Sequence, residues 1–300
     1  MITVRLSGGL GNQLFQYAVA VFLNPSAEPM RIEYQSKTSK SHDERELVIL
    51  NFNIPDNNSI VPCGQYNREH WFKHKLTNII RKVFSPLIKD DNCSQQSELL
   101  FKICNGLGYC IQDKHTYFYP QKKDALFING MWHSSIYADK NKSLLQDYYH
   151  VKKELLSDNV LNTINEIRQE NSVCVHVRRG DYTTASGFTT CSLKYYENAV
   201  KTLESYFSNL KFYVFSDDIA WCKSNLIIKN ACFIDGNNKD YEDFELMRNC
   251  KHFIISNSTF SWWAAYLSSN VDKRVITPKT WFDGTDKSWL NLPEWIQIDR

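Results

Sequence analysis

The sequence predicts an α/β protein whose second half is built on a parallel β-sheet. After about residue 170, five short apolar runs alternate with helical stretches. At the N-terminus another apolar run leads through a glycine-rich turn into an apolar helix. The composition, 43% hydrophobic and 23% charged, is that of a globular protein. Continuously apolar strands that alternate with helices are typical of a parallel sheet covered on both faces.

The first half begins clearly and then becomes irregular. Its opening strand runs from Ile2 to Leu6, and a Gly8-Gly-Leu-Gly-Asn12 turn leads into a helix. Between Glu28 and Asp113 the apolar residues rarely recur at the regular spacing of a helix or a strand. The spacing does predict a helix over Trp71 to Val83, and the segment Tyr117 to Trp132 is aromatic and strand-like. We expect residues 1–165 to form an N-terminal lobe and residues 166–300 a second one.

The second half alternates strands and helices. Its expected strands are Val173 to Val177, Phe212 to Phe215, Cys232 to Ile234, Phe253 to Ile255 and Arg274 to Thr277. Ser192 is expected to cap a helix that places one apolar stripe inward, made of Leu193, Tyr196, Val200, Leu203 and Phe207. Three more helices are expected over Asp217 to Asn225, Asp240 to Cys250 and Thr259 to Ser268.

Charge and cysteine content exclude several classes of protein. A net charge of +2 is too small for a general polyanion binder, so we expect no nucleic-acid partner. Nine cysteines without a C-x-x-C pair argue against a zinc ribbon and are expected to be free thiols in a reducing compartment. The apolar run Leu14 to Leu23 lacks a cleavage site, and no run approaches the ~18 residues of a membrane span. We therefore expect a cytoplasmic protein.

Two adjacent arginines follow the first strand of the second half, in His176-Val-Arg-Arg-Gly-Asp-Tyr182. Charged groups at a strand end need a partner or water. A diphosphate would satisfy Arg178 and Arg179 through bidentate, charge-assisted bonds. The alternative is a solvated turn in which an arginine pairs with an aspartate, for which Asp181 is the local candidate.

Small hydroxyl residues open the helix after the fourth strand of this half. In Ser256-Asn-Ser-Thr-Phe-Ser-Trp-Trp263, the side chains of Ser258, Thr259 and Ser261 suit either helix capping or a phosphate at the helix N-terminus. In the preceding helix Asp240 is the expected cap. Asp243 can either favour the helix dipole or accept two hydrogen bonds from a guanine edge.

Three further features of the sequence do not indicate a function by themselves. Asp217 and Asp218 follow the second strand and can hold a divalent metal, although a capped helix start is favoured. The opening glycine turn lacks the G-x-G-x-x-G spacing of a dinucleotide loop. Trp281, Trp289 and Trp295 can stack on a sugar or pack in the core.

Taken together, the motifs resemble the α-1,2-fucosyltransferases of glycosyltransferase family 11. They occur in the family order and span almost the whole chain. The matching segments are Gly8-Gly-Leu-Gly-Asn-Gln-Leu-Phe-Gln-Tyr-Ala18, His176-Val-Arg-Arg-Gly-Asp-Tyr182, Tyr213-Val-Phe-Ser-Asp-Asp-Ile-Ala-Trp-Cys222, Asp243-Phe-Glu-Leu-Met247 and Asn257-Ser-Thr-Phe-Ser-Trp-Trp-Ala264. One departure is Gly130-Met-Trp-His133, where bacterial relatives carry an aromatic residue and Gln.

The resemblance implies a two-lobed GT-B-like fold and transfer of fucose from GDP-β-L-fucose to the 2-hydroxyl of a terminal galactose, with inversion and without a metal or other cofactor. It implies that Arg178 contacts the β-phosphate while Arg179 assists. The start of the last helix would cradle the phosphate, through Ser258, Thr259, Phe260 and Ser261. His176 and Asp243 would hold ribose and guanine.

The acceptor side and the catalytic base are less defined. Asp181 is the candidate base, and Asn12 is expected on the facing lobe, between donor and acceptor. Trp132 and His133 are expected to contact the acceptor, the alternative being that Trp132 packs in the core and His133 faces solvent. The expected acceptor is a galactose-terminated, lipid-linked O-antigen-type glycan at the inner face of the cytoplasmic membrane, with loose membrane association.

Three other function classes stay open at this point. A metal-dependent transferase would use Asp217 and Asp218. An α-1,6-type or protein O-fucosyltransferase-like enzyme shares the arginine motif but forms another linkage or uses another acceptor. A non-catalytic nucleotide-sugar or glycan-binding module would keep the site without turnover.

Overall fold

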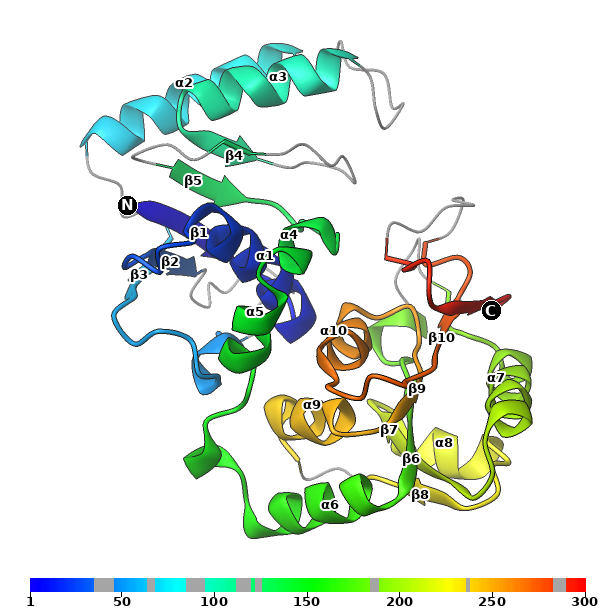
Figure 1. Cartoon of the computed structure of the whole chain (residues 1–300). Helices are drawn as coiled ribbons and strands as arrows, with labels where there is room; N and C mark the ends of the chain where they lie inside the picture. Colours follow the sequence, from blue (N-terminus) through cyan, green and yellow to red (C-terminus); the bar gives the residue numbers. More distant parts are fainter. Residues whose placement is uncertain are drawn as a thin grey trace. The chain divides into compact units, whose positions relative to one another are not determined.

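The chain forms two compact units, Met1–Tyr149 and His150–Arg300. The computed structural model describes residues 1–34, 46–63, 68–84, 95–111, 120–121, 126–183, 189–235, 238–282 and 290–300 (Figure 1). The division falls earlier than the boundary expected at residue 165. The reason is helix α6 (Asp158–Gln169), which packs on helix α9 and strand β6 of the second unit.

A five-stranded parallel sheet organises the first unit. Its strand order is β3-β2-β1-β5-β4. The strands are β1 (Ile2–Leu6), β2 (Arg31–Tyr34), β3 (Ser59–Pro62), β4 (Tyr109–Ile111) and β5 (Leu126–Asn129). The sequence showed no clear signal for β2, β3 and β4, because each has only three or four residues and the edge strand β3 is exposed or half-buried throughout.

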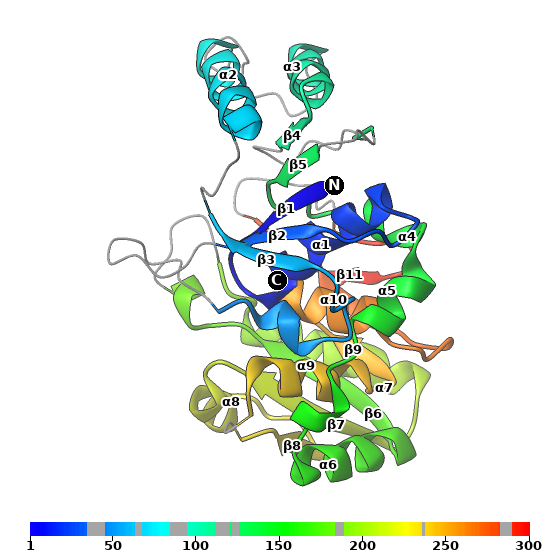
Figure 2. The same ribbon diagram turned by 90° about the vertical axis from the view of Figure 1, so that its left-hand side faces the viewer.

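The helices of the first unit differ in how deeply they are buried. Helix α1 (Leu10–Leu23) is buried over most of its length, whereas α2 (Arg68–Phe84) and α3 (Gln95–Gly106) form a separate pair beyond β4 and β5 (Figure 2). The helix expected over Trp71 to Val83 is confirmed within α2. The remaining helices are η1 (Val48–Asn51), α4 (Ile136–Asp139) and α5 (Lys142–Tyr148).

The second unit is built on a six-stranded parallel sheet with the order β8-β7-β6-β9-β10-β11. Its first strand lies centrally, the next two extend to one side and the last three to the other, which is the Rossmann order. The strands are β6 (Asn171–Val177), β7 (Leu210–Ser216), β8 (Ala231–Phe233), β9 (His252–Ile254), β10 (Val275–Pro278) and β11 (Ile296–Ile298). The expected two-unit α/β architecture with a Rossmann-like C-terminal sheet is confirmed, and only β11 was missed.

The expected helices of the second unit are present. They are α6, α7 (Leu193–Tyr206), α8 (Ile219–Asn225), α9 (Asp240–Arg248) and α10 (Thr259–Leu267), with the 3-10 turns η3 (Lys153–Leu155) and η4 (Asp181–Thr183). Ser192 caps α7, since its Oγ accepts from the Tyr195 amide at 3.2 Å. The expectation that Leu193 faces inward is wrong: it lies in the exposed first turn, and Tyr195 and Ala199 complete the buried stripe instead.

The late tryptophans build the core of the second unit. Trp262 stacks on Tyr266 at 4.7 Å between ring centroids and donates to the Leu290 carbonyl at 2.7 Å. Trp281 and Trp295 are also buried, so packing explains them and sugar stacking does not. Trp289 lies outside the described residues.

The cysteines of the described residues are free thiols, as expected. Among the described residues, no helix has the length and apolar character needed to cross a bilayer.

Gln13 joins the glycine turn to the rest of the first unit. Its side chain is buried, and Nε2 donates to the carbonyls of Gly8 and Glu46, both at 2.9 Å. Its Oε1 accepts from the Ile49 amide at 3.1 Å. The motif residue next to Asn12 is therefore a structural anchor that holds the turn and η1 together.

We expect Gln13→Ala to lower the free energy of unfolding by about 2–4 kcal/mol, because it removes two partly buried hydrogen bonds and leaves the buried Ile49 amide without its partner. Urea unfolding measures the change. Gln169→Ala, at the exposed end of α6, is the matched control and should change it by less than about 0.5 kcal/mol. Equal effects of the two substitutions would refute the anchoring role.

Candidate functional site

The two central strands of the second sheet bring the arginine and hydroxyl motifs together. Strand order reverses between the neighbours β6 and β9, and ligands of such sheets bind outside the carboxyl ends of the strands at this point. The His176 ring nitrogen Nδ1 lies 2.9 Å from Ser256 Oγ. Tyr182 donates its hydroxyl to the Asn257 carbonyl at 3.2 Å. Segments 176–182 and 256–261 are therefore one site.

The two arginines are held by the two aspartates that follow β7. Arg178 Nη1 lies 3.0 Å from Asp217 Oδ2, and Arg179 Nε donates to Asp218 Oδ2 at 3.1 Å. Asp217 also accepts from the Arg179 amide at 2.9 Å. Both arginines therefore pair with aspartates, and these are Asp217 and Asp218 after β7, which were not predicted as their partners. The Asp181 carboxylate lies outside the described part of the site.

The two guanidinium groups are partly exposed, and neighbouring aromatic rings hold their direction. Both side chains are about a fifth exposed, at 22% and 23%. Arg179 also lies 3.8 Å above the Trp221 ring centroid and Arg178 5.5 Å from that of Tyr182, so both are fixed in direction.

Gly180 is a site residue that the sequence did not reveal. A Cβ at this position would lie 2.5 Å from Asp217 Oδ2, closer than side chains approach one another. Only glycine therefore lets the turn after the arginines pack against that carboxylate. The sequence signal was present, since Gly180 lies inside the arginine motif, but nothing in the motif says what the glycine approaches.

Asp217 and Asp218 are already engaged in the protein. Asp217 binds the arginine segment through both oxygens, and Asp218 also caps α8 by accepting from the Trp221 amide at 3.2 Å. The capped helix start favoured from the sequence is confirmed. Among the described residues no group of three His, Cys, Asp or Glu side chains is placed to bind a metal ion.

The start of α10 has the geometry of an anion site. Ser258 is the N-cap residue, but its side chain makes no capping hydrogen bond. The first amides of a helix lack intrahelical partners and lie at the positive end of its dipole. Phe260 lies beside the His176 ring, with centroids 5.7 Å apart. Ser261 is buried and donates to the Ser258 carbonyl at 3.2 Å, so its hydroxyl serves the helix and is not directed at a ligand.

Asn257 fixes the loop that carries this helix start. Its side chain is buried, and Nδ2 donates to the carbonyls of Thr189 and Trp281 at 3.1 and 3.0 Å. No role was predicted for Asn257. The only signal in the sequence is that an amide stands among the hydroxyl residues of this motif, and an amide nitrogen can donate two hydrogen bonds.

His176 is a neutral, buried member of the site. Burial, followed by the charge of Arg178, lowers the pKa of its imidazole to about 3. Its ring is fixed between Ser256 and Phe260. His176 thus supports the start of α10; the contact with ribose stays a prediction.

The Asp243 carboxylate is partly desolvated. Burial raises the pKa of its carboxyl to about 6, although Nδ2 of Asn238 donates to Oδ1 at 2.8 Å and acts in the opposite direction. The capping role expected of Asp240 is wrong. Lys239 is the N-cap residue of α9, and Glu242 accepts from its amide at 3.0 Å. Glu242 thus serves the start of α9, and Asp243 instead accepts from Asn238.

The residues expected on the acceptor side meet at the strand-order reversal of the first sheet. The turn after β1 and the segment after β5 lie side by side, and Asn12 Oδ1 is 3.0 Å from His133 Nε2. Gly8 has a φ of +74°, and a Cβ there would lie 2.7 Å from Asn12 Nδ2. Gly8 therefore leaves room for the Asn12 side chain.

Trp132 and His133 have different roles in the structure. Trp132 is 1% exposed, and its ring packs on Tyr137 with centroids 5.4 Å apart. Its expected contact with the acceptor is replaced by core packing. Its φ of +56° is unusual for a bulky residue and sets the direction of the following His133. His133 does not simply face solvent, since it is half-buried, bonded to Asn12 and packed on Phe15.

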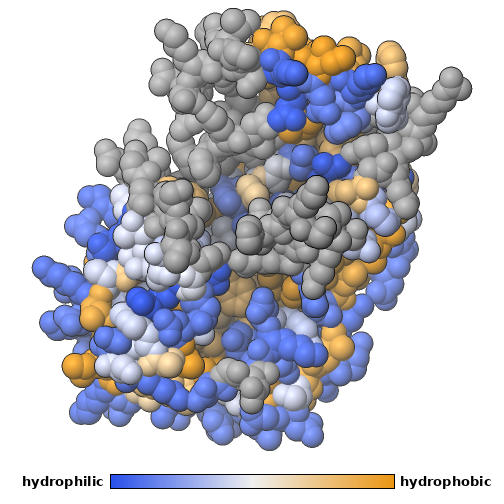
Figure 3. Space-filling view, turned by 180° about the vertical axis from the view of Figure 1, so that it is seen from behind, coloured by the Kyte–Doolittle hydropathy of each residue, from blue (hydrophilic) through white to orange (hydrophobic). Residues whose placement is uncertain are grey.

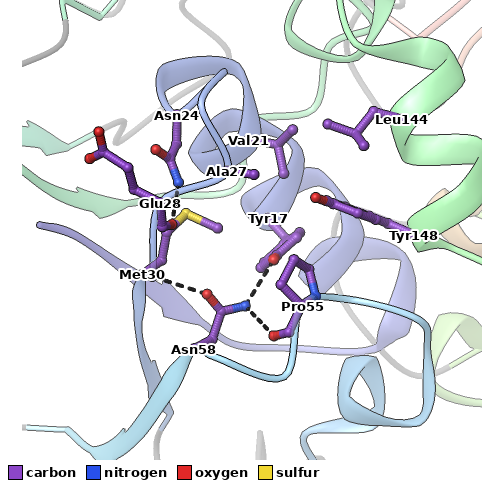
Figure 4. A pocket seen from close by; sticks show the side chains of 10 residues that line it. All are labelled: Tyr17, Val21, Asn24, Ala27, Glu28, Met30, Pro55, Asn58, Leu144 and Tyr148. Atoms are coloured by element: carbon purple, nitrogen blue, oxygen red, sulfur yellow. Dashed lines mark hydrogen bonds between the residues drawn. The ribbon is translucent and has the colours of Figure 1, made fainter.

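A small pocket in the first unit lies beside the C-terminal half of α1 (Figure 4). Asn58 anchors it by donating to the Tyr17 hydroxyl and the Pro55 carbonyl at 3.1 and 2.9 Å. None of the predicted site residues lines it. Its lining is Tyr17, Val21, Asn24, Ala27, Glu28, Met30, Pro55, Asn58, Leu144 and Tyr148.

Comparison with known proteins identifies relatives along the whole chain. The model of the family described as glycosyl transferase family 11 matches residues 114–299. The chain is 32% identical to an alpha-1,2-colitosyltransferase of Escherichia coli, over 100% of this chain and 99% of that protein. It is 29% identical to the O-antigen biosynthesis glycosyltransferase WbnK of Escherichia coli, over 98% and 99%.

Solved structures give more distant likenesses. The alpha-1,6-fucosyltransferase NodZ soaked with GDP-fucose matches with a TM-score of 0.48 and 14% identity, over 89% of this chain and 91% of that one. The Escherichia coli ADP-heptose LPS heptosyltransferase II matches with a TM-score of 0.47 and 13% identity, over 99% and 89%.

We expect Asp243→Asn to stabilise the protein more at pH 7.5 than at pH 4.5, by about 2 kcal/mol. The folded carboxyl holds its proton up to about pH 6, whereas the unfolded carboxyl loses it near pH 4. The wild-type free energy of unfolding therefore falls as the pH rises through this window, and asparagine removes that loss. Urea unfolding at both pH values is the measurement. Asp240→Asn, in the same first turn but exposed, is the control; the same pH dependence in both variants would contradict the assignment.

Proposed function

The chain belongs to glycosyl transferase family 11, and from this membership we propose that it transfers L-fucose from GDP-β-L-fucose to the 2-hydroxyl of a terminal galactose, with inversion. One observation carries the donor assignment. Arg178 and Arg179, fixed by Asp217 and Asp218, lie at the strand-order reversal of a Rossmann-ordered sheet, beside the start of α10. This combination suits a nucleoside diphosphate.

The diphosphate would be held from two sides. The exposed side of the Arg178 guanidinium would bind the β-phosphate in a charge-assisted, bidentate manner. The first amides of α10, with Ser258 and Thr259 beside them and Phe260 supporting the turn, would bind its other oxygens. Asp217 would keep the Arg178 guanidinium in place, and Arg179 would hold the loop through Asp218.

In the transfer step, the bond between the fucose anomeric carbon and the β-phosphate oxygen breaks while a bond to galactose O2 forms from the opposite face. Negative charge then grows on the departing GDP, where Arg178 stabilises it most in the transition state. The proton of the 2-hydroxyl passes to a base. Asp181, which begins η4 directly after the arginine turn, is our candidate.

The carboxylate of Asp243 would recognise guanine. A guanine edge offers two N–H donors, and a carboxylate accepts both. The raised pKa supports this role, because an ionised carboxylate that is poorly solvated in the free protein gains most from two new donors. His176 would line the ribose side.

Asn12 and His133 would bind the acceptor. Their mutual hydrogen bond joins the turn after β1 to the segment after β5, so both side chains lie near the carboxyl ends of these two strands. Trp132 would act indirectly, since its buried ring and left-handed backbone set where His133 points.

The reaction is proposed to need no metal ion. Two arginines and a helix N-terminus already balance the charge of a diphosphate. Asp217 and Asp218, the carboxylates best placed by sequence to bind a cation, are engaged by arginines and by the α8 amides.

The names of two similar proteins suggest candidates for the acceptor and for the transferred sugar. One is named for O-antigen biosynthesis, which supports an O-antigen-type glycan, assembled on a lipid carrier in the cytoplasm, as the setting. The other is named an alpha-1,2-colitosyltransferase, so colitose is the second candidate for the transferred sugar. Both candidates share the 2-linkage.

The decisive experiment offers GDP-fucose and GDP-colitose, each with a panel of galactosides, in the presence of EDTA. The product linkage is read by NMR. Fucosyl transfer to galactose O2 in EDTA supports the full proposal. A preference for colitose corrects the donor, a 6-linked product corrects the linkage, and activity restored by manganese or magnesium refutes metal independence. GDP binding without turnover would indicate a binding module.

We expect Arg178→Lys to lower kcat by at least about tenfold, because an ammonium cannot reproduce the bidentate fork on the departing phosphate. Steady-state kinetics with GDP-fucose give the value. Arg168→Lys, on the exposed face of α6, should keep wild-type kinetics. Normal turnover of the Arg178 variant would remove that residue from the reacting centre.

We expect GDP to bind wild-type protein about tenfold more weakly at pH 5 than at pH 7.5 through protonation of Asp243, whose carboxyl titrates near pH 6. Calorimetric titration measures the affinity. The phosphate of GDP also titrates in this range, so the comparison is with Asp243→Asn, which should bind weakly at both pH values and show only the phosphate's pH dependence. The same pH dependence in both proteins would return Asp243 to a purely structural role.

A further inference from the structure

Helix α2 directs its apolar stripe away from its own unit. Phe72, Ile79 and Val83 are 64%, 53% and 58% exposed, and Leu76 between them is also exposed. These residues are spaced by four, three and four positions, so they share one face of the helix. Surface helices normally turn such a stripe toward the core.

The opposite face of α2 is the one that packs. Thr77 is fully buried, and the His74 ring lies 5.9 Å from that of Tyr109 and 6.2 Å from that of Phe127, both in the sheet. The inward contact is therefore made by polar and aromatic side chains from the side away from the stripe. Among the described residues, the first unit therefore packs against the face of α2 that lies opposite its apolar stripe.

Helix α3 extends this apolar surface. Leu99 and Ile103, four residues apart, are exposed, while Phe101 and Cys104 face inward. The helices α2 and α3 contact each other. Figure 3 shows apolar side chains at the top of the view, over this helix pair. We refer to the exposed face formed by Phe72, Leu76, Ile79, Val83, Leu99 and Ile103 as the α2–α3 face.

The charge of α2 is strongly positive. The helix has five Lys or Arg residues and one Glu, a net charge of +4, whereas the whole chain is only +2 and the remainder is therefore −2. Lys75 and Lys82 are exposed and flank the apolar stripe. Lys75 Nζ lies 4.9 Å from the ring of Trp71, which is itself half exposed. Apolar and aromatic groups bordered by lysines are typical of helices that lie in a membrane interface.

The same lysines argue against a second copy of the chain as the occupant. The four-three-four spacing is also that of a coiled-coil seam, whose flanking positions here are 73, 75, 80 and 82. Three of these are lysines, Lys73, Lys75 and Lys82. Two copies paired through this stripe would place like charges against each other. An anionic lipid surface matches both the apolar stripe and its basic border.

We propose that the α2–α3 face docks the protein on a bilayer that contains anionic lipid, with the apolar stripe of α2 inserted at the level of the headgroups. This inference does not depend on which sugar is transferred. It assigns the contact to a site made of residues outside the donor and acceptor machinery.

Co-sedimentation with phosphatidylcholine vesicles, with and without phosphatidylglycerol, tests the proposal. We expect partition onto the anionic vesicles only, and weakening by salt. Lys75→Glu with Lys82→Glu should lower the partition coefficient at least about fivefold for each lysine. Phe72→Ser with Ile79→Ser should lower it at least about tenfold.

Matched controls change equally exposed residues of the second unit. Ile227 and Val271 are 99% and 92% exposed, and Lys201 and Lys229 are exposed as well. Ile227→Ser with Val271→Ser, and Lys201→Glu with Lys229→Glu, should leave partition unchanged. All four double variants should keep transfer to a soluble galactoside, or GDP binding if no transfer occurs, which shows that they fold. Binding to neutral vesicles alone, equal losses in the controls, or a dimer that Phe72→Ser with Ile79→Ser disrupts would overturn the proposal.

Discussion

The pairing of two arginines with two aspartates at the ends of β6 and β7 is the constraint on which the second unit's site depends. Asp217 binds the arginine segment through a side chain and an amide, and Asp218 joins Arg179 to the start of α8. Charged groups at the end of a buried strand need such partners or water. The pairing therefore compensates two cationic groups at the end of β6, a strand that borders the point where the strand order reverses.

Other parts of the site have features that lower the stability of the folded protein and that the fold itself does not require. The Asp243 carboxylate is half-buried although α9 already has a complete capping arrangement from Lys239 and Glu242. Ser258 stands at the N-cap position without using its hydroxyl to cap. Trp132 holds a left-handed backbone conformation. Strain and unused polar capacity of this kind concentrate where a protein binds a ligand.

The sequence predicted the second sheet well because its strands are continuously apolar and separated by amphipathic helices, as in Val173 to Val177. It also predicted that the arginine and helix-start segments converge, since parallel strands end at one edge. It did not predict β2 to β4, which have only three or four residues each, nor the partners of Arg178 and Arg179. Pairing across strands depends on register and side-chain direction, which no local pattern encodes. For the same reason the sequence left open whether Trp132 packs in the core, and it did not show that Ser261 is buried.

The central position of β1 and β6 has a consequence for synthesis on the ribosome. Strand β1 pairs with β2 soon after it is made, but its other edge waits for β5, more than a hundred residues later. Strand β6 likewise pairs with β7 before β9 exists. Each nascent unit therefore carries an open, apolar strand edge until its last central partner emerges. Such edges invite pairing with other chains, so the interval before β5 and β9 appear is when this protein is most exposed to aggregation.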